Sequence, residues 1–188
     1  MAKKMLVVVD YQNDFVDGAL GFPGAELLDT GIAERVRKAN ENGDIVVVTL
    51  DTHGKNYLET REGRALPIEH CIRGTHGWEL YGETGKAIMA MTENIVTLQK
   101  GTFGASPADI VVFLNCYKVE EVEFVGLVTN MCVVSNVCCF QAMWPEAQMV
   151  VDAALVDSFD KRLHKATLDV LRGMQVKVIE DPYVHRAV

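Results

Sequence analysis

Several features that would assign this chain to a specialised class are missing from its sequence. Its N-terminal segment, "MAKKMLVVVD", contains only a short apolar stretch, too short for a signal-peptide core or a membrane span. Long runs of basic residues are also missing, and the formal net charge is -8, which is not the electrostatic footprint of a protein that binds phosphate backbones. We therefore expect a cytoplasmic protein with neither nucleic acid nor a membrane as its partner.

The sequence also lacks repeats, low-complexity tracts and linkers, and its cysteines do not suggest a disulfide framework. Five cysteines are an odd number in a chain of 188 residues without an export signal, which favours free thiols in a reducing compartment over a disulfide framework. The G-x-G-x-x-G spacing of dinucleotide-binding proteins does not follow the first apolar run, and no P-loop occurs. The composition, with 49% hydrophobic and 23% charged residues, is that of an ordinary globular protein, for which we expect one domain over residues 1–188.

What the sequence does contain is an alternation of short β-branched runs with longer amphipathic segments. The short runs are continuously apolar, which is the pattern of parallel strands buried on both faces. The alternation predicts an α/β fold, a three-layer α/β/α arrangement around a six-stranded, mainly parallel, doubly wound sheet. Strands are expected at 5–10, 44–51, 94–100, 122–128, 147–155 and 174–181, and helices at 25–43, 107–119, 132–144 and 161–173. The segment at about 51–93 has little periodicity and is expected to be a functional loop excursion with a short helix near 85–92.

Four predicted strands bring polar or nucleophilic residues to one edge of the sheet. The strands of an open parallel sheet all finish at the same edge, where ligands bind. The first four end in Asp10, Asp51, Lys100 and the turn that leads to Cys132. A carboxylate can accept the proton of a thiol, and a lysine can stabilise negative charge beside both groups. The sequence therefore predicts a catalytic group formed by Asp10, Lys100 and Cys132.

Cys132 is the cysteine best placed for chemistry. It stands where a strand passes into a helix, and the N-terminus of a helix lowers the pKa of a thiol and can bind an oxyanion. A free cysteine is also often only a small buried apolar residue, and taken alone Cys132 fits both interpretations. For Cys116, Cys138 and Cys139 we expect the second interpretation to hold.

A second candidate group follows the second predicted strand. Asp51 and His53 alternate on an extended segment, so both can face the same side, and His70 returns later in the excursion. Two imidazoles and a carboxylate are a typical ligand set for a divalent transition metal with positions left open for water or substrate. Glu59 is a candidate fourth ligand. The competing interpretation is that His53 and His70 are surface loop residues without a metal. We disfavour it because Asp51 ends the strand beside the one that ends in Asp10.

These motifs, in their order along the chain, resemble those of the nicotinamidases, within the isochorismatase-like cysteine hydrolase superfamily. The resemblance covers essentially the whole chain. The segment "VVVDYQNDFVDGALGFPGAE" is similar to the opening strand and loop of that family, and "LDTH" with "EHCIRGTHG" to its metal-binding loop. The segment "LQKGTFGAS" resembles the part that carries the family's lysine, and "FVGLVTNMCVVSN" resembles its nucleophile turn.

The resemblance implies an activity and a site. It implies the hydrolysis of nicotinamide to nicotinate and ammonia through a thioester at Cys132, with Asp10 and Lys100 completing the triad. It implies homo-oligomers and one divalent metal ion, Zn as the first choice and Fe or Mn as alternatives, bound by Asp51, His53 and His70. It further implies a cis peptide between Leu127 and Val128, an oxyanion hole formed by the backbone N–H groups of Val128 and Cys132, and a substrate ring flanked by Phe15, Leu66 and Phe103.

Three positions depart from the family pattern, and two other functions stay open. Glu59 stands where many relatives have a third histidine, Leu66 replaces a tryptophan near the expected ring site, and Asn130 replaces an aspartate in the nucleophile turn. None of these changes removes a catalytic group. One alternative function is a metal-free relative that acts on another small amide or on a vinyl ether such as isochorismate. The other is a non-catalytic binding or regulatory module that shares only the architecture.

Overall fold

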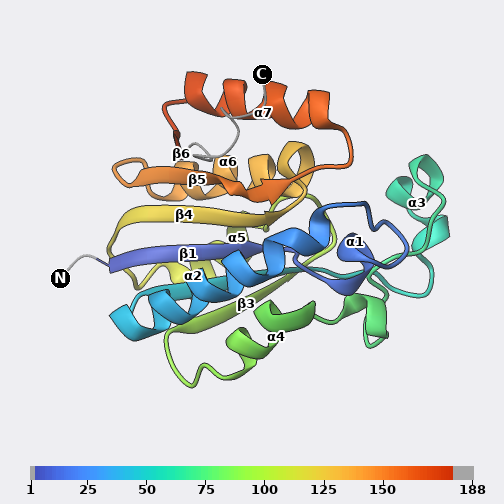
Figure 1. The fold of residues 1–188 in the computed structure, drawn as a ribbon, viewed down its shortest axis with the longest axis horizontal. Coiled ribbons are helices and arrows are strands. Elements are labelled where there is room, and N and C mark those ends of the chain that lie inside the picture. The colour runs from blue at the N-terminus through green and yellow to red at the C-terminus, as the bar shows by residue number, and fades with distance from the viewer. Residues whose placement is uncertain (1–2, 180–188) are drawn as a thin grey trace.

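The computed structural model describes residues 3–179, in which six strands form one sheet between two layers of helices (Figure 1). The strand order is β3-β2-β1-β4-β5-β6, and every pair of neighbours is parallel. This arrangement confirms the predicted fold class. The strands are β1 (Lys3–Val9), β2 (Ile45–Asp51), β3 (Ile95–Lys100), β4 (Val119–Leu127), β5 (Gln148–Asp157) and β6 (Lys177–Ile179).

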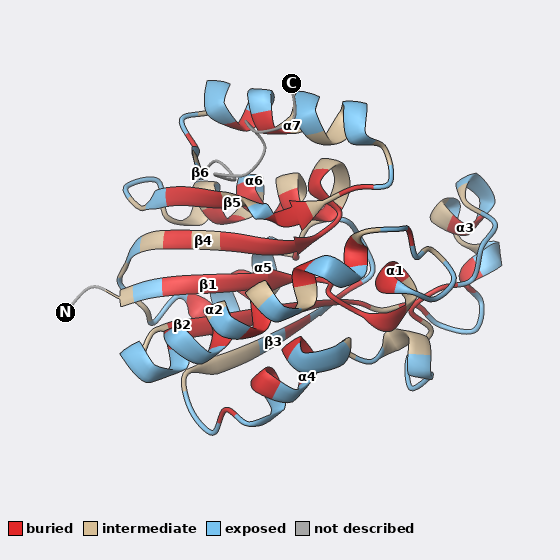
Figure 2. Ribbon diagram, viewed as in Figure 1, coloured by how far each residue is buried: buried red, intermediate tan, exposed pale blue. Residues whose placement is uncertain are grey.

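Each face of the sheet is covered by its own helices and has its own apolar cluster. Helices α2 (Asp29–Asn42) and α4 (Gly82–Met89) cover one face, and α5 (Pro107–Leu114), α6 (Val134–Met143) and α7 (Lys161–Gly173) cover the other. The central strands β1 and β2 are buried along most of their length (Figure 2), as their continuously apolar sequences predict. None of the described helices has the length and apolar character needed to cross a membrane.

The boundaries of the elements follow the predictions closely in some places and not in others. Helix α7 has the predicted limits, and Gly43, with φ of 70°, caps the C-terminus of α2 in the left-handed conformation. The predicted helix at 107–119 is wrong beyond Leu114, because Val119 already belongs to β4, where it pairs with Lys3. The predicted strand at 174–181 is shorter at its start, and its last two positions lie outside the described residues.

Between β2 and β3 the chain leaves the sheet and forms the predicted excursion. It contains 3-10 turns at Tyr57–Glu59 and His76–Trp78 and helices α3 (Arg61–Ala65) and α4. Figure 1 shows α3 and the short helix α1 (Asn13–Val16) beyond the carboxyl ends of the strands. The expected helix near 85–92 begins earlier, at Gly82, because the carboxylate of Asp29 accepts hydrogen bonds from the N–H groups of Glu83 and Thr84. That cap comes from a residue distant in sequence, which no local pattern reveals.

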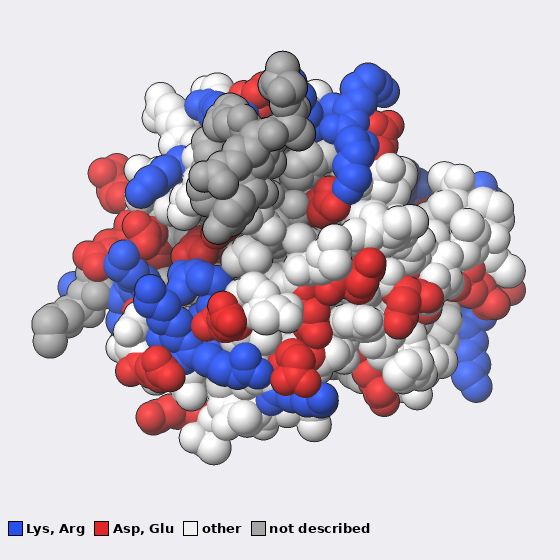
Figure 3. All heavy atoms as spheres, viewed as in Figure 1, with Lys and Arg blue, Asp and Glu red and all other residues white. Residues whose placement is uncertain are grey.

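Acidic and basic side chains are interspersed on the face that carries α2. Figure 3 shows basic residues near α2 with acidic residues set among them. Arg37 of α2 and Lys86 of α4 both pair with Glu83, and all three side chains are largely exposed. Exposed pairs of this kind contribute little to stability, so this surface is mainly a solvated one.

Candidate active site

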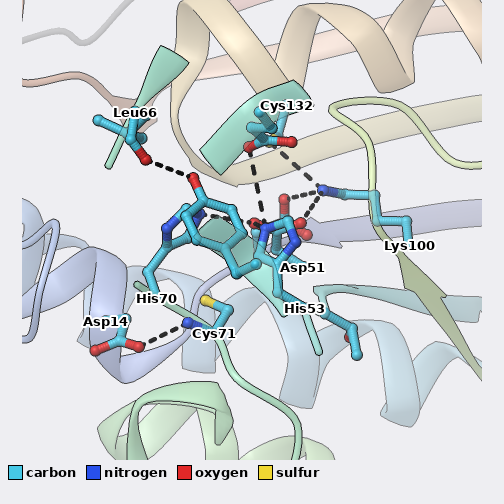
Figure 4. A network of polar contacts seen from close by, with 12 residues as sticks. Asp14, Asp51, His53, Leu66, His70, Cys71, Lys100 and Cys132 are labelled. Atoms are coloured by element: carbon cyan, nitrogen blue, oxygen red, sulfur yellow. Dashed lines mark hydrogen bonds and ion pairs between the residues drawn. The ribbon is translucent and has the colours of Figure 1, made fainter. Parts of the chain in front are cut away.

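The ends of three neighbouring strands and one turn meet at the carboxyl edge of the sheet (Figure 4). The Nζ atom of Lys100 lies 2.6 Å from Oδ2 of Asp10, 3.6 Å from Oδ1 of Asp51 and 3.5 Å from Sγ of Cys132. Asp10 is 0% exposed, and the other three residues are 5% exposed. The four residues singled out at strand ends in the sequence therefore lie within contact range of one ammonium group.

Strand register explains the meeting of Asp51 and Lys100. The two residues are direct partners in the pairing of β2 with β3. Side chains alternate along a strand, so Lys100 faces the same side as Leu98, which belongs to the apolar cluster under α5 and α6. On this buried face of the sheet, the side chains are therefore apolar along the strands and charged at the strand ends.

Asp10 reaches the same side only because the backbone changes there. Val8 packs on the α2 side of the sheet and Val9 on the opposite side, so regular alternation would send Asp10 to the α2 side. Asp10 has a φ of 45°, in the left-handed region that aspartate tolerates better than most residues. Its carboxylate consequently lies beside Thr49 of β2, whose hydroxyl donates a hydrogen bond of 2.6 Å to Oδ1.

Cys132 is held in a π-helical turn, Thr129–Val133, between β4 and α6. The peptide bond between Leu127 and Val128 is cis, as the resemblance implied. Asn136, which is 0% exposed, donates to the carbonyl of Cys132 at 2.8 Å and accepts from the N–H of Ala105 at 2.9 Å. Asn136 therefore connects the turn that contains Cys132 to the loop after β3 by hydrogen bonds. We did not single it out from the sequence, where its signal is a lone amide in the apolar stretch "CVVSNVCCF".

Burial sets the protonation of the thiol. It raises the pKa of Cys132 well above the usual value, and Asp10 raises it further while Lys100 opposes both. The expected lowering of this pKa by a helix N-terminus is not found, because α6 begins only at Val134 and the side chain is buried. For Lys100, burial alone would lower the pKa, but Asp10, Cys132 and Asp51 outweigh burial and raise it. The site is thus an ion pair of Asp10 and Lys100 beside a neutral thiol.

The three predicted metal ligands form a second group next to the first. Oδ2 of Asp51 lies 3.1 Å from Nε2 of His53 and 3.4 Å from Nε2 of His70, and all three residues are buried. Nδ1 of His70 faces the carbonyl of Ile68 at 2.8 Å, so in the neutral ring the proton is on Nδ1 and the lone pair of Nε2 faces the carboxylate. The carboxylate oxygen and the ring nitrogen lone pairs repel one another at these distances, and a cation between them would remove that repulsion. The donor set fits one divalent transition-metal ion.

Glu59 does not lie beside this group, and Glu62 is the glutamate nearer to it. Glu59 is exposed and closes a 3-10 turn, whereas Oε1 of Glu62 lies 4.0 Å from Nε2 of His53. The hydroxyl of Thr60 accepts a hydrogen bond from the N–H of Gly63 and so starts α3, with Glu62 in its first turn. The assignment of Glu59 as fourth ligand is therefore corrected: the start of α3 turns the later carboxylate towards the cluster.

The three residues expected around a substrate ring differ in their placement. The ring of Phe15 lies edge-on to His70, with centroids 5.7 Å apart. Phe103 is 45% exposed and lines a cleft of about 290 Å³ that His53 and Glu62 also border. Leu66 is half-buried, and its carbonyl accepts a hydrogen bond from the hydroxyl of Tyr57 at 2.9 Å, while its side chain points away from Cys132 (Figure 4).

Two further residues support the metal group. Tyr57 is 0% exposed, and its ring centroid lies 4.6 Å from that of His53 and 4.9 Å from that of His70. Gln12 is also 0% exposed; its amide accepts from the N–H of Asp51 at 2.8 Å and donates to the carbonyl of Asp51 at 3.0 Å. Strand β1 ends at Val9 and so does not pair with Asp51. The side chain of Gln12 instead makes the hydrogen bonds to the backbone of Asp51 that a neighbouring strand would make. Sequence reasoning missed both residues, since neither carries metal-binding or nucleophilic chemistry.

Among the other cysteines, Cys71 lies beside the metal group, directly after His70 (Figure 4). Cys71, which the sequence analysis did not single out, is buried, and burial raises the pKa of its thiol. Cys116 and Cys138 are exposed and Cys139 is partly buried, so the expectation that these three are buried apolar residues is wrong for the first two. Cys138 lies on the outward side of α6, which sequence periodicity could not distinguish from the inward side, and Cys116 lies in the turn after α5, where the predicted helix does not continue.

A doubly wound parallel sheet with a thiol, a carboxylate and an ammonium group buried at its carboxyl edge is the arrangement of an α/β cysteine hydrolase. The Isochorismatase domain matches residues 4–181, and the chain belongs to the isochorismatase family. The family resemblance that the sequence motifs carried is thereby confirmed.

The chain is similar to a known sequence and to solved structures as follows. An isochorismatase family protein of Bacillus subtilis strain 168, PncA, is 30% identical over 169 residues, which cover 86% of this chain and 90% of that protein. The crystal structure of nicotinamidase/pyrazinamidase PncA from Bacillus subtilis is 30% identical, with a TM-score of 0.85 over 95% of this chain and 100% of that one. A pyrazinamidase of Pyrococcus horikoshii, solved in complex with zinc, shares the fold at 23% identity, with a TM-score of 0.78 over 95% of this chain and 99% of that one.

Proposed function

We propose that the chain hydrolyses nicotinamide to nicotinate and ammonia through a thioester on Cys132. The observation that carries the proposal is the contact of one ammonium group, on Lys100, with Asp10, Asp51 and Cys132. This contact joins a nucleophile and its proton acceptor to a cluster of metal-binding side chains. The nicotinamidase/pyrazinamidase activity named for the Bacillus subtilis relative supports the choice of substrate.

Asp51, His53 and His70 would hold one divalent ion, with Zn as first candidate and Fe or Mn as alternatives. When bound, the ion would supply an anchor for the ring nitrogen of the substrate, directly or through a water molecule. The zinc in the Pyrococcus horikoshii pyrazinamidase supports this choice of metal. Phe15, next to His70, and Phe103, at the cleft, would flank the ring.

The first half of the reaction forms the thioester. Asp10 accepts the proton of the Cys132 thiol, and the thiolate attacks the carbonyl carbon of the amide. The backbone N–H groups of Val128 and Cys132 would stabilise the resulting oxyanion, and each donor of this kind typically contributes about 3 kcal/mol to the transition state. The carbon–nitrogen bond then breaks as Asp10 returns the proton to the nitrogen, and ammonia leaves.

The second half of the reaction releases the acid. Asp10, again ionised, accepts a proton from a water molecule that attacks the thioester carbonyl. The carbon–sulfur bond breaks, the proton passes from Asp10 to the sulfur, and nicotinic acid leaves and loses its remaining proton to water as nicotinate. Lys100 stays charged throughout, because Asp10 and Asp51 hold it in place. Its charge stabilises the ionised forms of Asp10 and Cys132 in turn.

The test replaces the thiol and measures ammonia release from nicotinamide. Cys132→Ala should lower kcat/KM by at least a thousandfold, since it removes the sulfur that forms the thioester. Cys138→Ala is the matched control, because that thiol is exposed and lies outside the site, and it should stay within about twofold of the parent. Retention of the activity by Cys132→Ala would refute the assignment.

A metal-free relative that acts on another small amide or a vinyl ether is distinguished by metal content. Protein purified without chelator is expected to hold about one ion of Zn, Fe or Mn per chain, because three buried donors converge. Ammonia release from a panel of pyridine and pyrazine carboxamides, before and after chelation, tests the dependence. Full activity in a metal-free sample would favour the alternative function.

A further inference from the structure

Thr49 is a polar residue in the middle of the most completely buried strand. Every residue of β2 is buried, and Thr49 is 0% exposed. A β-branched side chain suits a strand, but valine would meet that need as well. A buried hydroxyl costs free energy unless it is hydrogen-bonded, so the contacts of this one indicate why it is there.

Both contacts of the hydroxyl are made to Asp10. The N–H of Asp10 donates to Oγ1 at 3.2 Å, and Oγ1 donates to Oδ1 of Asp10 at 2.6 Å. Because the backbone N–H occupies the acceptor side of the oxygen, the single hydroxyl proton is directed at the carboxylate. A hydrogen bond donated to a carboxylate stabilises its ionised form.

The two oxygens of Asp10 therefore have different surroundings. Oδ1 accepts the proton of Thr49, and Oδ2 lies 2.6 Å from the ammonium group of Lys100. A proton added at Oδ1 would meet the proton of the hydroxyl, and a proton added at Oδ2 would meet a proton of the ammonium group. The hydroxyl of Thr49 thus fixes which oxygen, Oδ2, lies on the side of Lys100, whose ammonium group also contacts the sulfur of Cys132.

We infer that Thr49 is a positioning residue that holds the carboxylate of Asp10 with Oδ2 towards Lys100 and supports its ionised form. The inference rests on the proposed role of Asp10 as the base. Four charged or titratable groups act on Asp10 besides Thr49: Lys100 from β3, Asp51 from the end of β2, Cys132 from the turn after β4 and Cys71 from the excursion. Burial raises the pKa of Asp10, Lys100 lowers it and Asp51 raises it, and the hydroxyl of Thr49 acts with Lys100.

The experiment compares Thr49→Val, which keeps the shape and removes the hydroxyl, with Thr49→Ser, which keeps the hydroxyl. Two rates are measured across pH on metal-saturated protein: kcat/KM for ammonia release from nicotinamide, and the alkylation of Cys132 by iodoacetamide. In Thr49→Val, kcat should fall at least tenfold with little change in KM. The acid limb of kcat/KM should move up by about one pH unit, because Asp10 is protonated more readily.

Alkylation at neutral pH should slow by about the same factor in Thr49→Val, and Thr49→Ser should restore both rates to within about threefold. Thr97→Val on β3 is the matched control, since Thr97 is exposed, and neither rate should change. Unchanged pH profiles and alkylation in Thr49→Val would overturn the inference, as would a failure of Thr49→Ser to restore them. If the parent protein does not act on nicotinamide, the proposed function fails, while the alkylation rates still decide the role of Thr49.

Discussion

Lys100 connects the two chemical groups of the site. Its side chain is 2% exposed, and its ammonium group lies between the carboxylates of Asp10 and Asp51. A buried charge without a partner is strongly destabilising, so this lysine is tolerated only because both carboxylates face it. In turn, its charge allows two carboxylates to remain ionised close together in a buried place. The same ammonium group therefore contacts both the thiol and a carboxylate of the candidate metal cluster.

The two glutamates near the cluster give a direct test of the metal site. Glu62 lies 4.0 Å from His53, and Glu59 is exposed. Glu62→Gln should weaken metal binding about tenfold or more, because it removes a negative charge beside the ligands. Glu59→Gln is the matched control with the same chemical change and should leave the affinity within about twofold. Titration of metal-free protein with Zn and with Mn, read by calorimetry, measures both variants.

A stronger effect of Glu59→Gln than of Glu62→Gln would restore the ligand assignment made from sequence. The physical reason for preferring Glu62 is local. The hydroxyl of Thr60 caps α3, and this cap fixes which carboxylate of the segment lies in the first helical turn.

At the scale of elements, the turn that holds Cys132 is hydrogen-bonded to a helix that contributes no catalytic or metal-binding side chain. His164 of α7 contacts the hydroxyl of Thr129, in the turn that holds Cys132, at 2.8 Å. Ser158, just before α7, donates to the side chain of Asn130 in the same turn at 2.6 Å. Asn130, which stands where the family pattern has an aspartate, thus links its turn to the segment before α7. The N-terminal end of α7 therefore supports the position of the thiol.

The start of α7 depends on one cap. The carboxylate of Asp160 accepts a hydrogen bond from the N–H of Leu163 at 2.9 Å. Asp160→Ala should lower the free energy of unfolding by about 1 kcal/mol, because it leaves the first turn without its acceptor. Urea denaturation followed by circular dichroism measures the change.

Asp169→Ala on the same helix provides the comparison. Asp169 makes an exposed ion pair with Arg172. Pairs of this kind contribute between about 0 and 1 kcal/mol, so the loss should be clearly smaller than for Asp160→Ala. Equal losses for the two variants would show that charge on α7, and not the cap, sets its stability.

At the scale of the whole molecule, the metal group ties the excursion after β2 to the sheet. Asp51 is the last residue of β2, and His70 lies near the middle of the excursion between β2 and β3. An ion bound to both binds the folded chain and not the unfolded one, so it stabilises the fold. At a free metal concentration of about 100 times Kd, the stabilisation is about 2.7 kcal/mol. Removal of the ion should lower Tm by roughly 5–10 °C in a chain of this size.

Differential scanning calorimetry before and after chelation tests this expectation. Added Zn should restore Tm, and added Mg should not, because magnesium prefers oxygen ligands to imidazole. A Tm that is the same with and without Zn would contradict a metal site that includes both Asp51 and His70.

Much of the fold and of the candidate site could be predicted because the relevant signals are local. The continuously apolar runs that predicted β1 and β2 are those that the sheet buries on both faces. Asp51 and Lys100 could be assigned to one edge because parallel strands end together, and the register then made them direct partners. Glu62, Gln12 and Thr49 could not be found in this way, since each acts through a contact with a residue far away in the sequence or through the direction of a single side chain.

The sequence by itself determined which elements form, their order, and which chemical groups stand at their ends, because hydrophobic periodicity and turn chemistry are properties of neighbouring residues. The tertiary structure alone decided how those groups face one another. The left-handed backbone at Asp10 turned its carboxylate to Thr49 and Lys100, and burial made Cys132 a neutral thiol. Distances between side chains and the loss of solvent around them arise only when distant segments pack, and these two quantities set the chemistry of the site.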